Sequence, residues 1–222
     1  MRIRPDDLDV NMREVDPETW PRKQQFETFR DFQFPHFNIC ADVDLTSFRP
    51  AIADAGMSFT AAFVYLIARS ANEVPEFRLR IRGGAVVEHD RVHPSATILV
   101  DDDRFSFCTL DYNDDFSVFA THVAERIAEV KKNPTVAVVN ERDDLLYMTA
   151  IPWVTFTSFS HPMPSLTADS VPRFTWQVHQ EGDSIKMPLS VQAHHALMDG
   201  FHVGRYFDTI ASYLRHPEKF LH

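Results

Sequence analysis

The chain has 222 residues and a formal net charge of −10 at pH 7. This length suits one globular domain over residues 1–222, and the negative charge argues against a nucleic-acid binder, which needs clustered Lys and Arg. The 19 phenylalanines favour a large aromatic core, an apolar ligand pocket, or both. No apolar run reaches the roughly 18 residues of a membrane span, and the charged N-terminus is unlike a signal peptide. Cys40 and Cys108 fit neither a metal motif nor a disulfide framework, so we expect a cytoplasmic protein with reduced, buried cysteines.

The first half of the chain predicts helices and strands in alternation. Residues 1–18 are polar and predict an extended N-terminal arm. The clearest helix is 58–74, whose apolar residues share one face and which Pro75 ends. Glycines 83 and 84 indicate a hairpin turn between two strands. The other expected elements are helices over 20–30 and 45–53 and strands over 38–45, 77–82 and 85–88.

The second half continues the same alternation. An amphipathic pattern with basic residues in its last turn predicts a helix over 115–132, and a second helix is expected over 201–214. The expected strands are 96–100, 105–110, 145–149, 153–159, 173–180 and 185–191. These elements predict an α/β fold. Since no glycine-rich phosphate loop is present in the sequence, a CoA-type cofactor is expected to bind in a channel.

The segment 192–200, QAHHALMDG, is the most informative in the chain. It places His195 between a predicted strand and a predicted helix, where side chains tend to point into clefts. An imidazole titrates near neutrality and can take a proton from an alcohol without a metal. Asp199 and Gly200 favour a tight turn, and a buried aspartate there would need a cationic partner. A pair of histidines can also simply fill a core, but HHxxxDG followed by FHVGRYF is too specific for that reading.

HHALMDGFHVGRYF resembles the signature of the type A chloramphenicol acetyltransferases. HHxxxDG alone is shared with peptide-synthetase condensation domains, which are about twice as long, and in relaxed form with dihydrolipoyl acyltransferases, whose lipoyl module this sequence lacks. The resemblance extends from about residue 20 to the C-terminus, through the blocks WPRKQQFETFR, RVHPSATI, TAIPWVTFTSF, PRFTW and QEGDSIKMPLSVQ. It implies a two-layer α+β domain with a mixed sheet flanked by helices, and a homotrimer whose active sites lie at subunit interfaces. It also implies acetyl-CoA as co-substrate, no metal, and inactivation of the antibiotic chloramphenicol.

Each catalytic role implied by the resemblance falls on one residue of this chain. His195 corresponds to the general base that removes the proton from the acceptor hydroxyl. Thr149 stands where the family has a serine that stabilises the oxyanion, so the hydroxyl is kept on a β-branched side chain. Asp199 and Arg22 correspond to a structural ion pair that fixes the turn beneath the base. Thr175 matches a threonine that contacts the reacting centre through water.

Substrate-binding positions depart further from the family pattern. Phe29 replaces a pocket tyrosine and loses its hydroxyl, and His36 lies in a loop that usually carries smaller residues. Thr97 and Phe105 match pocket positions. Ser58 stands where a basic residue often contacts CoA. These positions keep an aromatic slot for an aryl ring, while the loss of a polar contact can shift discrimination by roughly 1–3 kcal/mol.

Two other functions remain open from the sequence. One is an acyltransferase of the same fold that acts on a different alcohol or amine. The other is a ligand-binding relative without catalysis, in which HHxxxDG only supports the trimer. The intact set of His195, Thr149, Asp199 and Arg22 weighs against the second.

Overall fold

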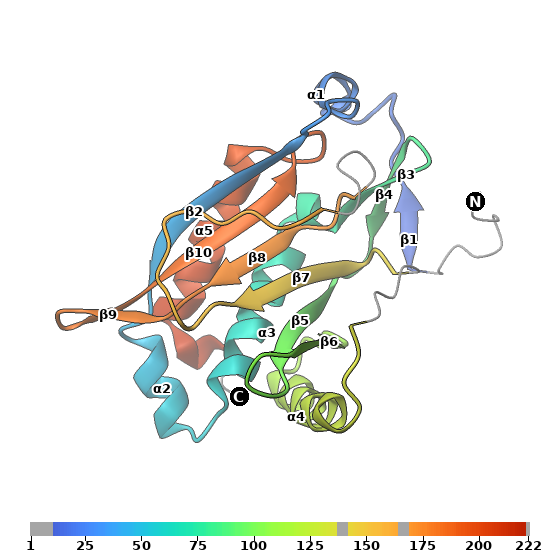
Figure 1. Cartoon of the computed structure of the whole chain (residues 1–222). Helices are drawn as coiled ribbons and strands as arrows, with labels where there is room; N and C mark the ends of the chain where they lie inside the picture. Colours follow the sequence, from blue (N-terminus) through green and yellow to red (C-terminus); the bar gives the residue numbers. More distant parts are fainter. Residues whose placement is uncertain (1–10, 137–141, 164–168, 221–222) are drawn as a thin grey trace.

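The computed structural model describes residues 11–136, 142–163 and 169–220, and its strands form two sheets (Figure 1). The strands are β1 (Met12–Glu14), β2 (His36–Asp44), β3 (Leu79–Arg82), β4 (Ala85–His89), β5 (His93–Leu99), β6 (Phe105–Thr109), β7 (Leu145–Ala150), β8 (Arg173–Trp176), β9 (His179–Glu181) and β10 (Ser184–His194). The smaller sheet is antiparallel with the order β1-β4-β3. The larger sheet has the order β2-β10-β8-β7-β5-β6, with β9 paired to β10. Because β7 pairs in parallel with both β5 and β8 while β10 is antiparallel to its partners, the predicted mixed sheet is confirmed.

Helices cover one face of the larger sheet (Figure 1). The described residues form the helices α1 (Lys23–Phe29), α2 (Phe48–Asp54), α3 (Phe59–Asn72), α4 (Phe116–Lys132) and α5 (Gly200–Arg215) and the 3-10 helices η2 (Pro75–Arg78) and η3 (Pro217–Lys219), of which α3 and α5 lie behind the sheet while α1 lies beyond the end of β2. Helix α3 begins where the Ser58 side chain accepts a hydrogen bond from the Ala61 N–H at 3.4 Å. Its side chains are buried on nearly all sides, so it forms the centre of the main core. In the part of the chain that the structure describes, no helix is long and apolar enough to span a bilayer.

The two faces of the larger sheet differ in polarity because side chains alternate along each strand. Val191, Phe174, Met148 and Ala96 are in register across four strands, and all are buried in the main core under the helices. The neighbouring register brings Ser190, Thr175 and Thr149 side by side on the opposite face. That polar face carries the hydroxyl groups described below.

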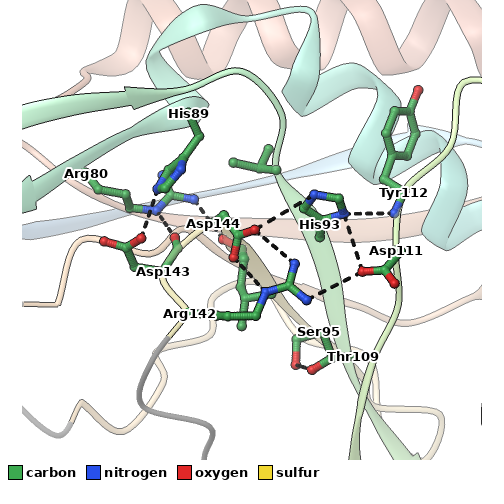
Figure 2. A network of polar contacts seen from close by, with 12 residues as sticks. Arg80, His89, His93, Ser95, Thr109, Asp111, Tyr112, Arg142, Asp143 and Asp144 are labelled. Carbon is green, nitrogen blue, oxygen red and sulfur yellow. Dashed lines mark hydrogen bonds and ion pairs between the residues drawn. The ribbon is translucent and has the colours of Figure 1, made fainter. Parts of the chain in front are cut away.

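A buried arginine joins the two sheets. Arg80 on β3 is fully buried, and its guanidinium donates to the backbone carbonyls of Phe77, Leu79, Asp143 and Leu145 at 2.5–2.8 Å. The Asp143 carboxylate in turn accepts hydrogen bonds from His89 (Figure 2) and from Arg82. Burial alone would raise the pKa of Asp143, but these hydrogen bonds hold it well below its usual range. The start of β7 is therefore bound to the smaller sheet by a network of paired charges.

The predicted elements differ from the structure in three places. Residues 153–159 do not form the expected strand but run as turns and irregular backbone. The strand expected from Phe77 begins at Leu79, because Pro75 starts a 3-10 turn. The strand expected over 173–180 is divided into β8 and β9.

Two further expectations concern the N-terminal arm and the two cysteines. Within the predicted arm, residues 1–10 lie outside the described residues and Met12–Glu14 pair with β4. Both cysteines are free, and Cys108 is buried as expected, whereas Cys40 is half-buried on β2.

Candidate active site

His195 lies in the link between the end of β10 and the start of α5. Its backbone N–H donates to the Pro35 carbonyl at 2.8 Å, which extends the β2–β10 ladder one residue past its last pair, His194 and His36. The backbone that carries the imidazole is therefore fixed by sheet pairing on one side and by a helix start on the other. The predicted position at a strand-to-helix junction is confirmed.

Two phenylalanine rings hold the His195 imidazole. The ring of Phe29 is stacked on it, with centroids 4.1 Å apart and planes 2° from parallel. Phe37 contacts it at 5.0 Å with an interplanar angle of 47°. Its Nδ1 is buried and makes no hydrogen bond to any described residue. An imidazole enclosed in this way has a fixed ring plane and few competing partners, which suits a group that must exchange a proton with a bound molecule.

Arg22 and Asp199 meet beneath this link, although 177 positions separate them in the sequence. Arg22 Nη1 donates to Asp199 Oδ2 at 2.8 Å, and Nε donates to the Leu197 carbonyl at 3.2 Å. Asp199 is also the N-cap of α5, where its Oδ1 accepts from the Phe201 N–H at 3.0 Å. Partial burial alone would raise the pKa of Asp199, but the hydrogen bonds from Arg22 and Phe201 lower it. One arginine therefore ties the link and the helix start to the segment before α1.

His194 and His36 form a second imidazole pair next to His195. They are cross-strand partners, and their rings meet edge-on at 4.9 Å with an interplanar angle of 75°. His36 Nε2 lies 2.8 Å from the Asp169 carbonyl oxygen, and His194 Nδ1 accepts from the Ala196 N–H at 3.3 Å. Burial lowers the pKa of His194 to about 4, and it also lowers the pKa of His36. Both rings are therefore neutral at neutral pH.

A row of hydroxyl groups crosses the polar face of the sheet. Thr97 donates to the Thr149 oxygen at 3.3 Å, and Thr149 is the register partner of the fully buried Thr175. Thr175 Oγ1 lies 2.8 Å from His161 Nε2. The row therefore runs from β5 through β7 and β8 to an imidazole on the segment that follows β7.

His161 is a site residue that the sequence reasoning missed. It lies on residues 151–163, which cross in front of β8 and β10 (Figure 1), and its N–H donates to the Gln192 side chain at 2.9 Å. Burial, with a smaller contribution from Arg173, lowers the pKa of His161 to about 4. No local pattern predicts this contact, because residues 151–163 pair with no strand that would place His161 over Thr175.

The structure does not bring His195 and the hydroxyl row together within one chain. Thr175 faces Ser190, which is five residues before His195 on an extended strand. At a rise of about 3.4 Å per residue, His195 lies roughly 17 Å along the strand from Thr175, and Thr149 is one strand further away. A single acceptor hydroxyl cannot contact both His195 and Thr149 of the same chain.

The remaining predicted positions lie near one of these two groups or on the surface. Phe29 and His36 belong to the imidazole group, as described above. Phe105, at the start of β6, is 48% exposed and contacts Phe107 edge-on, and Phe107 is the register partner of Thr97. Ser58 caps α3. In the described part of the chain, no three His, Cys, Asp or Glu side chains are arranged to hold a metal ion.

Known proteins resemble this chain over most of its length. The family model described as Chloramphenicol acetyltransferase matches residues 10–211. A chloramphenicol acetyltransferase of Escherichia coli is 33% identical over 201 residues, covering 90% of this chain and 92% of that protein. Chloramphenicol acetyltransferase 3 of the same organism is 31% identical over 206 residues, covering 90% and 96%.

Solved structures show the same relationship. A chloramphenicol acetyltransferase structure, 27% identical, superposes with a TM-score of 0.86 and covers 91% of this chain and 99% of that chain. A dihydrolipoamide acetyltransferase of Azotobacter vinelandii, 16% identical, has a TM-score of 0.65 and covers 90% and 88%. The second likeness concerns the fold alone.

Proposed function

This chain belongs to the chloramphenicol acetyltransferase family, and we propose that it transfers the acetyl group of acetyl-CoA to a hydroxyl of chloramphenicol. The observation that carries this proposal is the His195 imidazole, stacked on Phe29 above the Arg22–Asp199 pair. The reaction needs a neutral base with a fixed orientation, and this arrangement supports that role. Acetyl-CoA acts as co-substrate, and the acetylated antibiotic and free CoA are the products.

In the proposed mechanism His195 is the general base. Its imidazole takes the proton of the acceptor hydroxyl as that oxygen attacks the thioester carbonyl carbon. The tetrahedral intermediate then collapses, the carbon–sulfur bond breaks, and the imidazolium returns the proton to the departing CoA sulfur. Asp199 and Arg22 hold the backbone beneath the base and do not touch the reacting atoms.

Thr149 is the proposed oxyanion donor. Its oxygen accepts a hydrogen bond from Thr97, which leaves its own hydroxyl proton free to donate. A donor already oriented in this way stabilises the negative charge that develops on the thioester oxygen. Thr175, held by His161, contributes a second hydroxyl beside it.

The separation between His195 and Thr149 supports an oligomeric enzyme. Because the two groups lie at least roughly 17 Å apart in one chain, His195 of one copy must meet the hydroxyl row of another. We propose the homotrimer that the family resemblance implies, with each active site at a subunit interface. Residues 1–222 then form one acetyltransferase domain that acts in the cytoplasm.

The acceptor pocket is proposed on the hydroxyl-row side of this interface. Thr97, Thr175 and the exposed ring of Phe105 line it, and an aromatic side chain suits an aryl substrate. The resemblance also places Phe29 and His36 in the pocket, and this stays a prediction, since their rings here contact His195 and His194.

One observation favours a different acceptor. The imidazole of His161 adds a polar group beside Thr175, and Phe29 lacks a hydroxyl. A site that hydrogen-bonds its substrate rejects an analogue without the matching polar group. An alcohol or amine other than chloramphenicol is therefore the second candidate.

Thiol release measured with purified protein tests both candidates. The protein is mixed with acetyl-CoA and a thiol reagent, and chloramphenicol or a panel of alcohols and amines is added. Release that depends on chloramphenicol and disappears in His195→Ala supports the main proposal. Release with another acceptor alone supports the second, and no release with any acceptor leaves a non-catalytic ligand-binding protein.

A further inference from the structure

His36 and His194 form the last pair of the β2–β10 ladder, directly before His195. Their rings are 4.9 Å apart and edge-on. Two nitrogens of this pair, His36 Nδ1 and His194 Nε2, are buried and have no hydrogen-bond partner among the described residues. An unpaired buried polar atom costs free energy, so each of these two nitrogens is expected to have a hydrogen-bond partner.

The backbone fixes the tautomer of His194. The Ala196 N–H can only donate, so Nδ1 of His194, which accepts it at 3.3 Å, carries a lone pair. The neutral ring must then hold its proton on Nε2. His194 therefore presents one unpaired donor.

A hydrogen bond at Nε2 fixes the tautomer of His36 in the same way. Its Nε2 lies 2.8 Å from the Asp169 carbonyl oxygen, which can only accept. The proton of a neutral His36 is therefore on Nε2, and Nδ1 carries a lone pair. His36 presents one unpaired acceptor.

We infer that His36 is a positioning residue whose Nδ1 accepts the Nε2 proton of His194. The hydrogen bonds then run in one direction from the Ala196 N–H, through both imidazoles, to the Asp169 carbonyl. The structure draws no bond between these two nitrogens, but the facing rings are 4.9 Å apart and the Cβ–Cγ torsion of histidine is broad, so a small rotation of the rings would form it.

This chain of hydrogen bonds holds the backbone on both sides of His195. Ala196 follows the proposed base, and His36 follows Pro35, whose carbonyl accepts the His195 N–H. The inference rests on the proposed role of His195. In it, the effect of His36 on the base passes through His194 and is separate from the predicted place of His36 in the acceptor pocket.

Two variants of His36 separate the two ends of its ring. In His36→Asn the side-chain oxygen takes the place of Nδ1 and can still accept from His194. In His36→Gln the amide reaches the place of Nε2 and can still donate to Asp169, but nothing replaces Nδ1. We expect the Asn variant to retain more of the wild-type kcat than the Gln variant, because only asparagine keeps an acceptor for His194. The Gln variant should lose about tenfold in kcat, the scale of one unmade buried hydrogen bond, with KM changed less than twofold. Equal kcat in both variants contradicts the inference.

Nitrogen-15 NMR of histidine-labelled wild-type protein tests the pair without activity. We expect both rings as Nε2–H tautomers, with a coupling across the hydrogen bond from His194 Nε2 to His36 Nδ1. A His194 ring protonated on Nδ1, or the absence of the coupling, overturns the inference even if a variant fails to fold. Turnover in His195→Ala would instead refute the proposed function, while the tautomers still decide the role of His36.

Discussion

Two clusters of ionisable side chains in this fold are built on opposite principles. Each nitrogen of the Arg80 guanidinium donates to a backbone carbonyl, and the Asp143 carboxylate accepts from His89 (Figure 2) and from Arg82. Around His195 three histidines each have a buried ring nitrogen that makes no hydrogen bond to a described residue, and the pairing inferred for His36 and His194 still leaves Nδ1 of His195 open. Both clusters are enclosed, so burial does not distinguish them. What distinguishes them is whether their polar atoms are satisfied.

The difference indicates that the Arg80 cluster stabilises the fold, whereas the His195 cluster is suited to the proposed catalysis. Paired groups at Arg80 join two sheets, and losing one partner leaves another charge or several carbonyls buried alone. An imidazole that acts as a base, the role proposed for His195, must keep a ring nitrogen available for the substrate, and hydrogen bonds from the protein to both nitrogens would block that role. Unpaired polar atoms beside stacked aromatic rings are therefore the better sign of the active site in this chain.

The largest expected effect is on catalysis, in His195→Ala. General bases contribute about 10²–10⁴-fold, so we expect kcat to fall by that factor while the melting temperature changes little. Initial rates of thiol release and a thermal melt measure the two quantities. The exposed His216→Ala serves as the control and should keep wild-type rates. Turnover near the wild-type value in His195→Ala would contradict the proposed mechanism.

The matching change in the paired cluster is Arg80→Met. It leaves the carbonyls of four residues unpaired in the core, which should lower the free energy of unfolding by about 3–5 kcal/mol. Urea unfolding at one protein concentration gives this value, and kcat per folded molecule should stay unchanged. Arg13→Met is the control, because Arg13 is exposed and pairs only at the surface. A loss of kcat without a loss of stability would reverse the assignment of the two clusters.

The hydroxyl row gives the next effect. Thr149→Val keeps the shape of the side chain and removes its hydroxyl, so we expect kcat to fall by about 10²–10³-fold. Thr149→Ser should keep or improve activity. KM should move less than kcat, because the hydrogen bond strengthens mainly in the tetrahedral intermediate. Equal rates with threonine and valine would assign the oxyanion to another donor, such as Thr175.

The Arg22–Asp199 pair is intermediate in character between the two clusters, since its charges are paired but partly exposed. Its side chains are 12% and 33% exposed, so solvent screens the interaction, and Arg22→Met should cost about 1–3 kcal/mol of unfolding free energy. Asp199→Asn should cost less, because asparagine is also a good N-cap. Urea unfolding ranks the two variants. A larger loss in Asp199→Asn would mean that charge, not capping, holds the start of α5.

Local patterns predicted most of the fold but not the contacts that build the site. Periodicity located α3 and α5, and the mixed sheet implied by the family resemblance is confirmed. The strand expected over 153–159 was wrong, because its residues favour strands but have no neighbouring strand to pair with; Trp153 is 71% exposed there. Strand composition reports side-chain preference, whereas pairing depends on distant parts of the chain.

The site shows the same limit. The signature identified His195 and Asp199, and the resemblance named Arg22 as the partner of Asp199, which the structure brings together. The stacking of Phe29 on His195 and the pairing of His36 with His194 depend on the position of α1 and on the register of β2. A one-residue change of that register would move His36 to the other face, and nothing in the local sequence sets it.

The smallest expected effect is on the pH dependence of stability. The folded pKa of His194 is about 4, below the ordinary value of about 6.5, so between these pH values the unfolded chain binds more protons than the folded one. This histidine therefore leaves stability intact near pH 7 and lowers it as the pH falls through that window, by about 1 kcal/mol between pH 7 and 5.5. The depressed pKa of Asp143 acts in another window, because its contribution is lost only as the pH falls below about 4. In His194→Asn, urea unfolding at pH 7 and 5.5 should show a smaller difference than in wild type, whereas exposed His216→Asn should not reduce it. An undiminished difference in His194→Asn would mean that the acid sensitivity arises elsewhere in the fold.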